Sequence, residues 1–192
     1  FLIDGSINRQ FLAKPEISDG FYFSLLFTKQ SQQFDKSCDF LQMISLAPCR
    51  KKIHKAITEN LKADTKSLVL TDSGQVLYRG HTIVSQDREL KNMCETIFNA
   101  PSVLYLKGAL TGSLYKFLAP FNKLQLILDN FTLFLNVTTS KRHWPGFKPE
   151  IFLYHPVPVK RIFIKQETHF DPALLPPGLK AKNIFREIHN EG

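Results

Sequence analysis

Apolar residues recur along this chain with two different periods, and the periods predict where strands and helices lie. Short apolar runs bounded by polar or turn-forming residues predict strands. These runs cover residues 21–27, 67–71, 75–79, 82–85, 102–107, 123–128, 131–137, 150–154 and 159–165. Apolar residues spaced three and four apart predict amphipathic helices, because they form one stripe on a helix. That spacing occurs at residues 35–45, 50–63 and 87–99.

Two polar turns predict how some of these strands pair. Asp72-Ser73-Gly74 separates the third strand from the second, and its glycine can supply the positive φ that tight hairpins need. Asp129-Asn130 separates the runs at 123–128 and 131–137 and predicts another hairpin. Hairpins pair their strands antiparallel. We therefore expect an α+β fold, with a mostly antiparallel sheet and two or three amphipathic helices packed on it.

The domain organisation follows from length and from the prolines near the end. A length of 192 residues fits one domain of ordinary size, or two small ones that share a core. We expect a single α+β domain over residues 1–170. Prolines then mark an extended tail over residues 171–192, which closes in a short helix at 182–189. Because the first residue is Phe1, we expect a piece of a longer protein or a processed chain.

Composition and charge narrow the class of protein. Hydrophobic residues make up 43% and charged residues 22%, which excludes a disordered or collagen-like chain. No apolar run reaches the roughly 18–20 residues that cross a bilayer, so we expect no transmembrane segment. The formal net charge is +8, which favours an anionic partner: nucleic acid, an anionic membrane surface or an acidic protein face. The same charge also fits a basic protein with no such partner.

Motifs for catalysis and for metal binding are missing from the sequence. The six histidines include no pair spaced four apart, and the chain has no G-x-S-x-G and no glycine-rich phosphate loop. Cys49 stands beside Arg50, whose charge could lower a thiol pKa, although a loop cysteine without a role is the favoured interpretation. We therefore expect no enzymatic activity, no cofactor and no metal site.

The cysteine count also bears on the compartment. Three cysteines without a C-x-x-C pair argue against a disulfide scaffold and for a reducing environment. We expect an intracellular protein, with the cytoplasm favoured over the nucleus.

Lysine and arginine residues gather in a few clusters that could bind a partner or an anion. One cluster lies at the start of a predicted helix, where cations oppose the helix dipole, and another lies on a loop beside a tryptophan. The alternative interpretation is a solvated charged surface. The candidate residues are Arg50, Lys51, Lys52, Lys55, Lys141, Arg142, Trp144, Lys160 and Arg161.

One segment resembles a known family. Residues 76–85 read VLYRGHTIVS, and this text resembles a hairpin of longin-like domains, as does the later strand at 103–108. The resemblance covers about a third of the chain and is nearest to the tri-longin family, which includes the Mon–Ccz, Hermansky–Pudlak and Inturned–Fuzzy subunits. It implies a non-enzymatic α/β module that pairs with a second longin subunit and binds small GTPases, often beside membranes. No residue here takes over a family role.

Two functions remain open at this point. The favoured one is a non-catalytic protein-interaction module within a larger intracellular complex, in small-GTPase regulation or trafficking, with a second protein subunit as partner. The alternative is a basic nucleic-acid-binding domain that uses the lysine and arginine clusters and Trp144. A protein interface predicts an exposed apolar patch, whereas a nucleic-acid interface predicts a steep dependence of affinity on salt.

Overall fold

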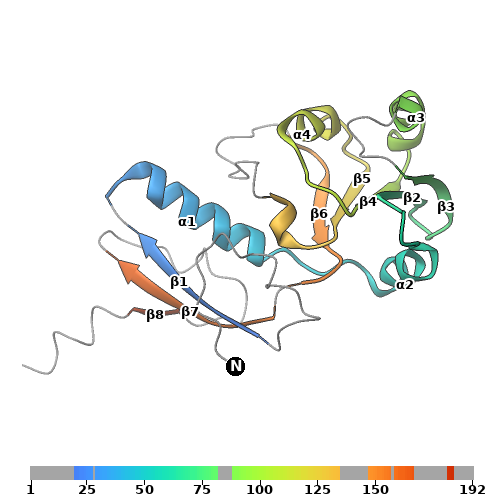
Figure 1. The fold of residues 1–192 in the computed structure, drawn as a ribbon. Helices are drawn as coiled ribbons and strands as arrows, with labels where there is room; N and C mark the ends of the chain where they lie inside the picture. Colours follow the sequence, from blue (N-terminus) through green and yellow to red (C-terminus); the bar gives the residue numbers. More distant parts are fainter. Residues whose placement is uncertain are drawn as a thin grey trace, which may run out of the picture. The chain divides into compact units, whose positions relative to one another are not determined.

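The described part of the fold contains two sheets, one packed with helix α1 (Ser31–Ile44) and the other with several helices (Figure 1). The computed structural model describes residues 20–27, 29–81, 88–134, 147–156, 158–166 and 181–183. The chain divides into two compact units. The inserted unit is Leu46–His155, and the outer unit combines Phe1–Ser45 with Pro156–Gly192. One unit thus interrupts the sequence of the other.

The inserted unit holds a five-stranded mixed sheet in the order β3-β2-β4-β5-β6. Strand β2 is antiparallel to both β3 and β4, whereas β4, β5 and β6 are parallel to one another. Its elements are α2 Lys51–Asn60, β2 Ser67–Thr71, β3 Val76–Gly80, α3 Arg88–Phe98, β4 Ser102–Leu106, α4 Gly112–Leu118, β5 Leu124–Leu128, the 3-10 helix η3 Phe131–Phe134 and β6 Glu150–Leu153. Helices packed with a mixed sheet confirm the expected α+β class.

The outer unit holds a three-stranded sheet in the order β1-β7-β8, and both of its pairings are parallel. Its elements are β1 Phe21–Phe27, α1 Ser31–Ile44, β7 Val159–Gln166 and β8 Ala181–Asn183. The antiparallel pairing expected from the sequence therefore occurs around β2, and the remaining pairs are parallel.

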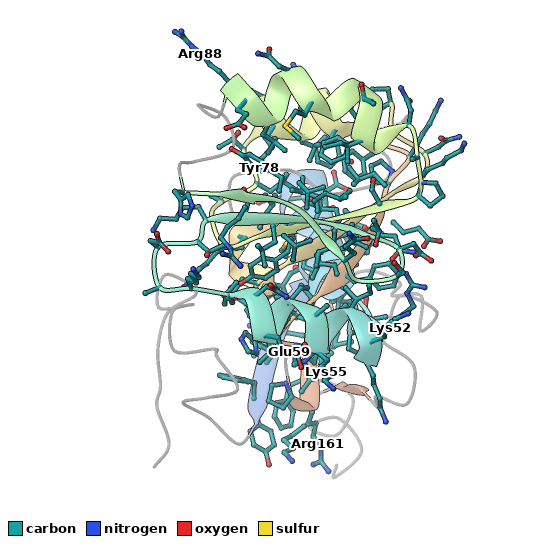
Figure 2. The ribbon with its side chains drawn as sticks, turned by 90° about the vertical axis from the view of Figure 1, so that its right-hand side faces the viewer. Lys52, Lys55, Glu59, Tyr78, Arg88 and Arg161 are labelled. Carbon is teal, nitrogen blue, oxygen red and sulfur yellow. The ribbon has the colours of Figure 1, made fainter. Side chains whose placement is uncertain are left out.

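The core of the inserted unit lies on both faces of its sheet. All five residues of β4 are buried, as its continuous apolar sequence predicts for a central strand. Figure 2 shows α2 and α3 on opposite faces of this sheet. On the α2 side, Ile53 and Ile57 of the helix pack with Leu68, Leu70 and Tyr105 of the strands. Burial of this apolar stripe holds α2 against the sheet.

Several predicted elements are confirmed. The helical spacings at 35–45, 50–63 and 87–99 correspond to α1, α2 and α3. The hairpin at Asp72-Ser73-Gly74 joins β2 to β3, with Thr71 N–H donating to the Gln75 carbonyl oxygen at 2.9 Å. Gly74 has φ of +92°, which is the conformation that this turn requires of glycine.

The second predicted hairpin is wrong. After Asp129-Asn130 the chain enters η3 instead of a return strand, and residues 135–137 lie outside the described residues. The reason is that β5 is a central strand, with parallel partners β4 and β6 along its two edges. No edge of β5 remains for an antiparallel neighbour. A polar Asp-Asn pair after an apolar strand marks the end of that strand equally well.

The structure also divides the chain differently from the expected single domain over 1–170 and tail over 171–192. The strand β7 pairs with β1, which precedes the inserted unit, and β8 lies within the expected tail. The helix expected at 182–189 begins inside β8, so its start is wrong, and its remaining residues lie outside the described part. The strand expected at 82–85 lies outside that part as well.

Core truncation tests this assignment of the sheet. Leu126 is 0% exposed and Phe98 is 1% exposed. Replacing either by Ala should lower the free energy of unfolding by about 2–5 kcal/mol, because each change leaves a cavity. Leu77→Ala, at a side chain that is 43% exposed, is the matched control and should cost much less. Equal urea midpoints for Leu126→Ala and the unchanged protein would show that Leu126 is not in the core.

Candidate functional site

Helix α1 covers one face of the outer sheet (Figure 1). Side chains at alternate positions of β1 point toward it. Phe23 makes an edge-on contact with Phe40 of α1 at 4.9 Å between ring centroids, and Phe27 makes one with Phe34 at 5.6 Å. These contacts bury the α1 side of the sheet, and the intervening residues of β1 therefore lie on the other side.

The opposite side of the outer sheet carries the candidate site. Paired residues of parallel strands project on the same side, so the register of β1 with β7 fixes which side chains share it. We call this surface the open face. It consists of Tyr22, Ser24 and Leu26 from β1 and Arg161, Phe163 and Lys165 from β7.

Two aromatic rings lie together on the open face. The ring centroids of Tyr22 and Phe163 are 6.5 Å apart and their planes differ by 21°. Tyr22 is 64% exposed, and Leu77 of the inserted unit is the other large apolar side chain with high exposure in the described part of the chain. Tyrosine side chains in folded proteins usually have much of the ring covered, so a ring this exposed is available for contact.

Positive charge accompanies the rings. The strands of the outer sheet contain no Asp or Glu, and their cations are Lys160, Arg161, Lys165 and Lys182. Arg161 and Lys165 are exposed, and Figure 2 shows Arg161 extending away from the ribbon. Lys160 is the extra residue of an irregularity between Val159 and Arg161, and its side chain lies against Gly20. The open face is thus aromatic and cationic.

The predicted cluster Arg50, Lys51, Lys52 and Lys55 lies at the start of α2 in the inserted unit. Arg50 forms an ion pair with Asp72, and its guanidinium also donates to the Gln125 side chain at 3.2 Å. This contact with Arg50 holds the pKa of Asp72 below its usual value.

The remaining members of that cluster are all exposed. Lys55 lies 3.7 Å from Glu59 one turn along α2, whereas Lys51 and Lys52 project into solvent. The Arg50 charge is therefore paired with a residue of the β2–β3 turn in the inserted unit. The three lysines remain exposed on the surface of α2. The other predicted residues, Lys141, Arg142 and Trp144, lie outside the described residues.

A polar cluster gathers where the parallel strands β4, β5 and β6 end. The Tyr105 hydroxyl donates to Asp129 Oδ1 at 2.7 Å, and Asn130 Nδ2 donates to Asp129 Oδ2 at 2.9 Å. Burial, with the Asp129 carboxylate, raises the pKa of Tyr105, so its hydroxyl stays protonated. The Tyr154 hydroxyl lies 2.8 Å from Thr58 Oγ1 on α2. These groups satisfy one another and fasten α2 to the strand ends.

Cys49 does not have the lowered thiol pKa that its neighbour Arg50 could have produced. Burial raises the pKa of Cys49 to about 11, and the Arg50 side chain binds Asp72 instead. The sequence suggested a lowered value as one alternative, and the structure overturns it. The favoured interpretation, a cysteine without reactivity, fits the raised pKa.

Metal sites and membrane-spanning helices are both absent from the described part of the chain. No three His, Cys, Asp or Glu residues come together there in a way that could hold a metal ion. Within the same residues, no helix combines the length and apolarity needed to cross a membrane.

The candidates from the sequence include one cation of the open face, Arg161, and leave out Lys165 and both rings. Arg161 was a candidate because of its charge, whereas Tyr22 and Phe163 belonged to predicted strands with no binding role assigned. Whether a ring of β1 or β7 is exposed depends on which side of the outer sheet α1 covers. No local sequence pattern indicates which side that is.

Comparison with family models, with curated proteins and with solved structures found no match to this chain.

The Arg50–Asp72 ion pair can be tested by titration. In Arg50→Gln the pKa of Asp72 should rise toward its ordinary value, because the guanidinium no longer stabilises the carboxylate. NMR titration of the Asp72 side-chain carboxyl carbon measures this shift directly. Because both side chains are half-exposed, the free energy of unfolding should change by about 1 kcal/mol or less. An unchanged Asp72 pKa would show that the pair does not form in solution.

The protonation of Cys49 can be tested by alkylation. A thiol with a pKa of about 11 is almost wholly protonated at pH 8, so iodoacetamide should leave Cys49 unmodified in the native protein. Modification should increase as the pH approaches 11. In urea, where the thiol is no longer buried, the pH at which modification increases should fall to the ordinary thiol pKa. Peptide mass spectrometry gives the modified fraction. Rapid modification of native Cys49 at pH 8 would contradict the assignment.

Proposed function

We propose that the protein is a non-catalytic interaction module of a larger intracellular complex, and that it binds its partner through the open face. The observation that carries this proposal is the 64% exposure of Tyr22 on a sheet whose other side is closed by α1. Isolated apolar side chains at a surface are ordinary. Here the exposed ring adjoins Phe163 and is paired in register with Arg161. The open face therefore has neighbouring aromatic and cationic side chains.

The residue types of the open face support binding. Tyrosine and arginine are enriched among the residues that contribute most to interfaces, because each offers a large flat surface together with hydrogen-bond donors. Ser24 is also exposed between Tyr22 and Leu26 and adds a hydroxyl group. A partner that covers the rings would remove apolar area from water and could accept hydrogen bonds from the surrounding donors.

The compartment in the proposal rests on the cysteines. Cys49 forms no disulfide and is buried within the inserted unit. A cysteine that contributes to the core as a thiol suits a reducing compartment, which favours the cytoplasm. A role in small-GTPase regulation or trafficking rests on the longin resemblance alone and stays a prediction.

Affinity purification of the tagged full chain tests the proposal. The lysate should be treated with nuclease, and the bound proteins identified by mass spectrometry. Tyr22→Ala should lose a stoichiometric partner that the unchanged protein retains, because the most exposed ring of the surface is removed. Leu77→Ala, which removes the other exposed apolar side chain, is the matched control and should retain that partner. Equal recovery with Tyr22→Ala would place the interface elsewhere on the protein.

Loss of every partner on nuclease treatment has a different meaning. If recovery of both protein and nucleic acid from the untreated lysate depends on Tyr22, the open face remains the interface and its direct ligand is nucleic acid.

A further inference from the structure

We infer that the open face binds single-stranded nucleic acid, with Tyr22 and Phe163 stacking on bases and Arg161 and Lys165 contacting phosphates. This inference rests on the proposed function for its surface, and it differs in naming nucleic acid, in place of a protein subunit, as the direct ligand of the open face. It follows from the juxtaposition of two rings and two cations on one side of the β1–β7 pair.

The rings suit bases. Their planes differ by 21°, so the neighbouring rings of Tyr22 and Phe163 have similar orientations. Every base has a flat face that can stack on such a ring, and stacking is the main sequence-independent contribution to the binding of single strands. In a duplex those faces are already covered by neighbouring base pairs. The open face should therefore prefer a single strand.

The charges suit phosphates more than a protein surface. Arg161 is paired in register with Tyr22, and Lys165 with Leu26, so the two exposed cations flank the ring of Phe163 along β7. The three strands of this sheet contain no acidic residue, and the whole chain carries a net charge of +8. Lysine is usually depleted at the centre of a protein–protein interface, although arginine is enriched there, so Lys165 in particular fits phosphate better. A surface on which cations alternate with rings instead matches a strand in which phosphates alternate with bases.

Fluorescence anisotropy with labelled oligonucleotides tests the inference on the full chain. The probes are dT and U homopolymers of about 12 nucleotides, within the range that small single-strand sites occupy, and a duplex of the same length. The unchanged protein should bind both single strands more tightly than the duplex. Photo-crosslinking of 4-thiouridine in the U probe should attach to the peptides that contain Tyr22 and Phe163.

Variants separate stacking from charge. Tyr22→Ala should weaken binding to the single strands about 5- to 150-fold, the usual range for removal of one stacking ring. Tyr22→Phe keeps the ring and should bind nearly as the unchanged protein does. Arg161→Gln with Lys165→Gln should weaken binding and should also reduce the slope of log affinity against log salt by about 1.4, or about 0.7 for each phosphate that is no longer neutralised.

Two control variants lie in the inserted unit. Lys107→Gln removes one exposed cation there, and Leu77→Ala removes one exposed apolar side chain. Both should bind the probes as the unchanged protein does. Since Tyr22 is 64% exposed, its replacement should leave the thermal unfolding midpoint in place, which shows that a loss of binding is not a loss of folding.

The possible results separate this inference from the proposed function. Binding that is insensitive to Tyr22 and to the two cations would overturn the inference, because the charge of the whole chain would then be its source. Absence of oligonucleotide binding, together with a nuclease-resistant protein partner that depends on Tyr22, would overturn the inference and leave the proposed function in place. If neither ligand depends on the open face, both fail.

Discussion

The parallel pairing of β1 with β7 is the constraint on which the outer unit depends. These two strands are separated by the whole inserted unit, so their pairing closes a long loop, which costs conformational entropy. The inserted unit lowers that cost because it brings its own two ends together. Cys49 N–H donates to the Leu153 carbonyl oxygen at 2.9 Å, and Leu153 N–H donates to the Ala47 carbonyl oxygen at 3.0 Å. Folding of the insertion therefore prepares the pairing of the strands that flank it.

The same pairing determines what the open face contains. Once β1 and β7 are in register and α1 covers Phe23 and Phe27, the alternate residues of both strands must face away from the helix. The outer sheet thus has one side in an apolar core and one side that displays rings and cations. In the inserted unit, by contrast, the sheet has helices on both faces, and the polar groups at the strand ends bind one another. The polar side chains of the two sheets therefore differ in position. In the described part, only the sheet of the inserted unit has helices on both faces, whereas the outer sheet exposes cations on one face.

Much of the secondary structure was predictable because it depends on local spacing. The stripe of Ile53 and Ile57 predicted α2, and the glycine turn before β3 predicted its hairpin. Parallel partners are distant in sequence and share no turn, so neither β1–β7 nor β5–β6 could be inferred from neighbouring residues. The same limit applies to the candidate site. Charge identified Arg161 directly, whereas the exposure of Tyr22 follows from long-range pairing.

The insertion also sets the order in which the protein can fold during synthesis. A ribosome completes β1 and α1 first, then the entire inserted unit, and only afterwards β7. Until β7 emerges, the apolar side of β1 has a helix but no neighbouring strand, and its backbone edge is unpaired. The inserted unit has all its strands before β7 is made, because β6 ends at Leu153 and β7 begins at Val159. Until β7 pairs with β1, the nascent chain therefore keeps an unpaired strand edge, and such edges are prone to aggregation.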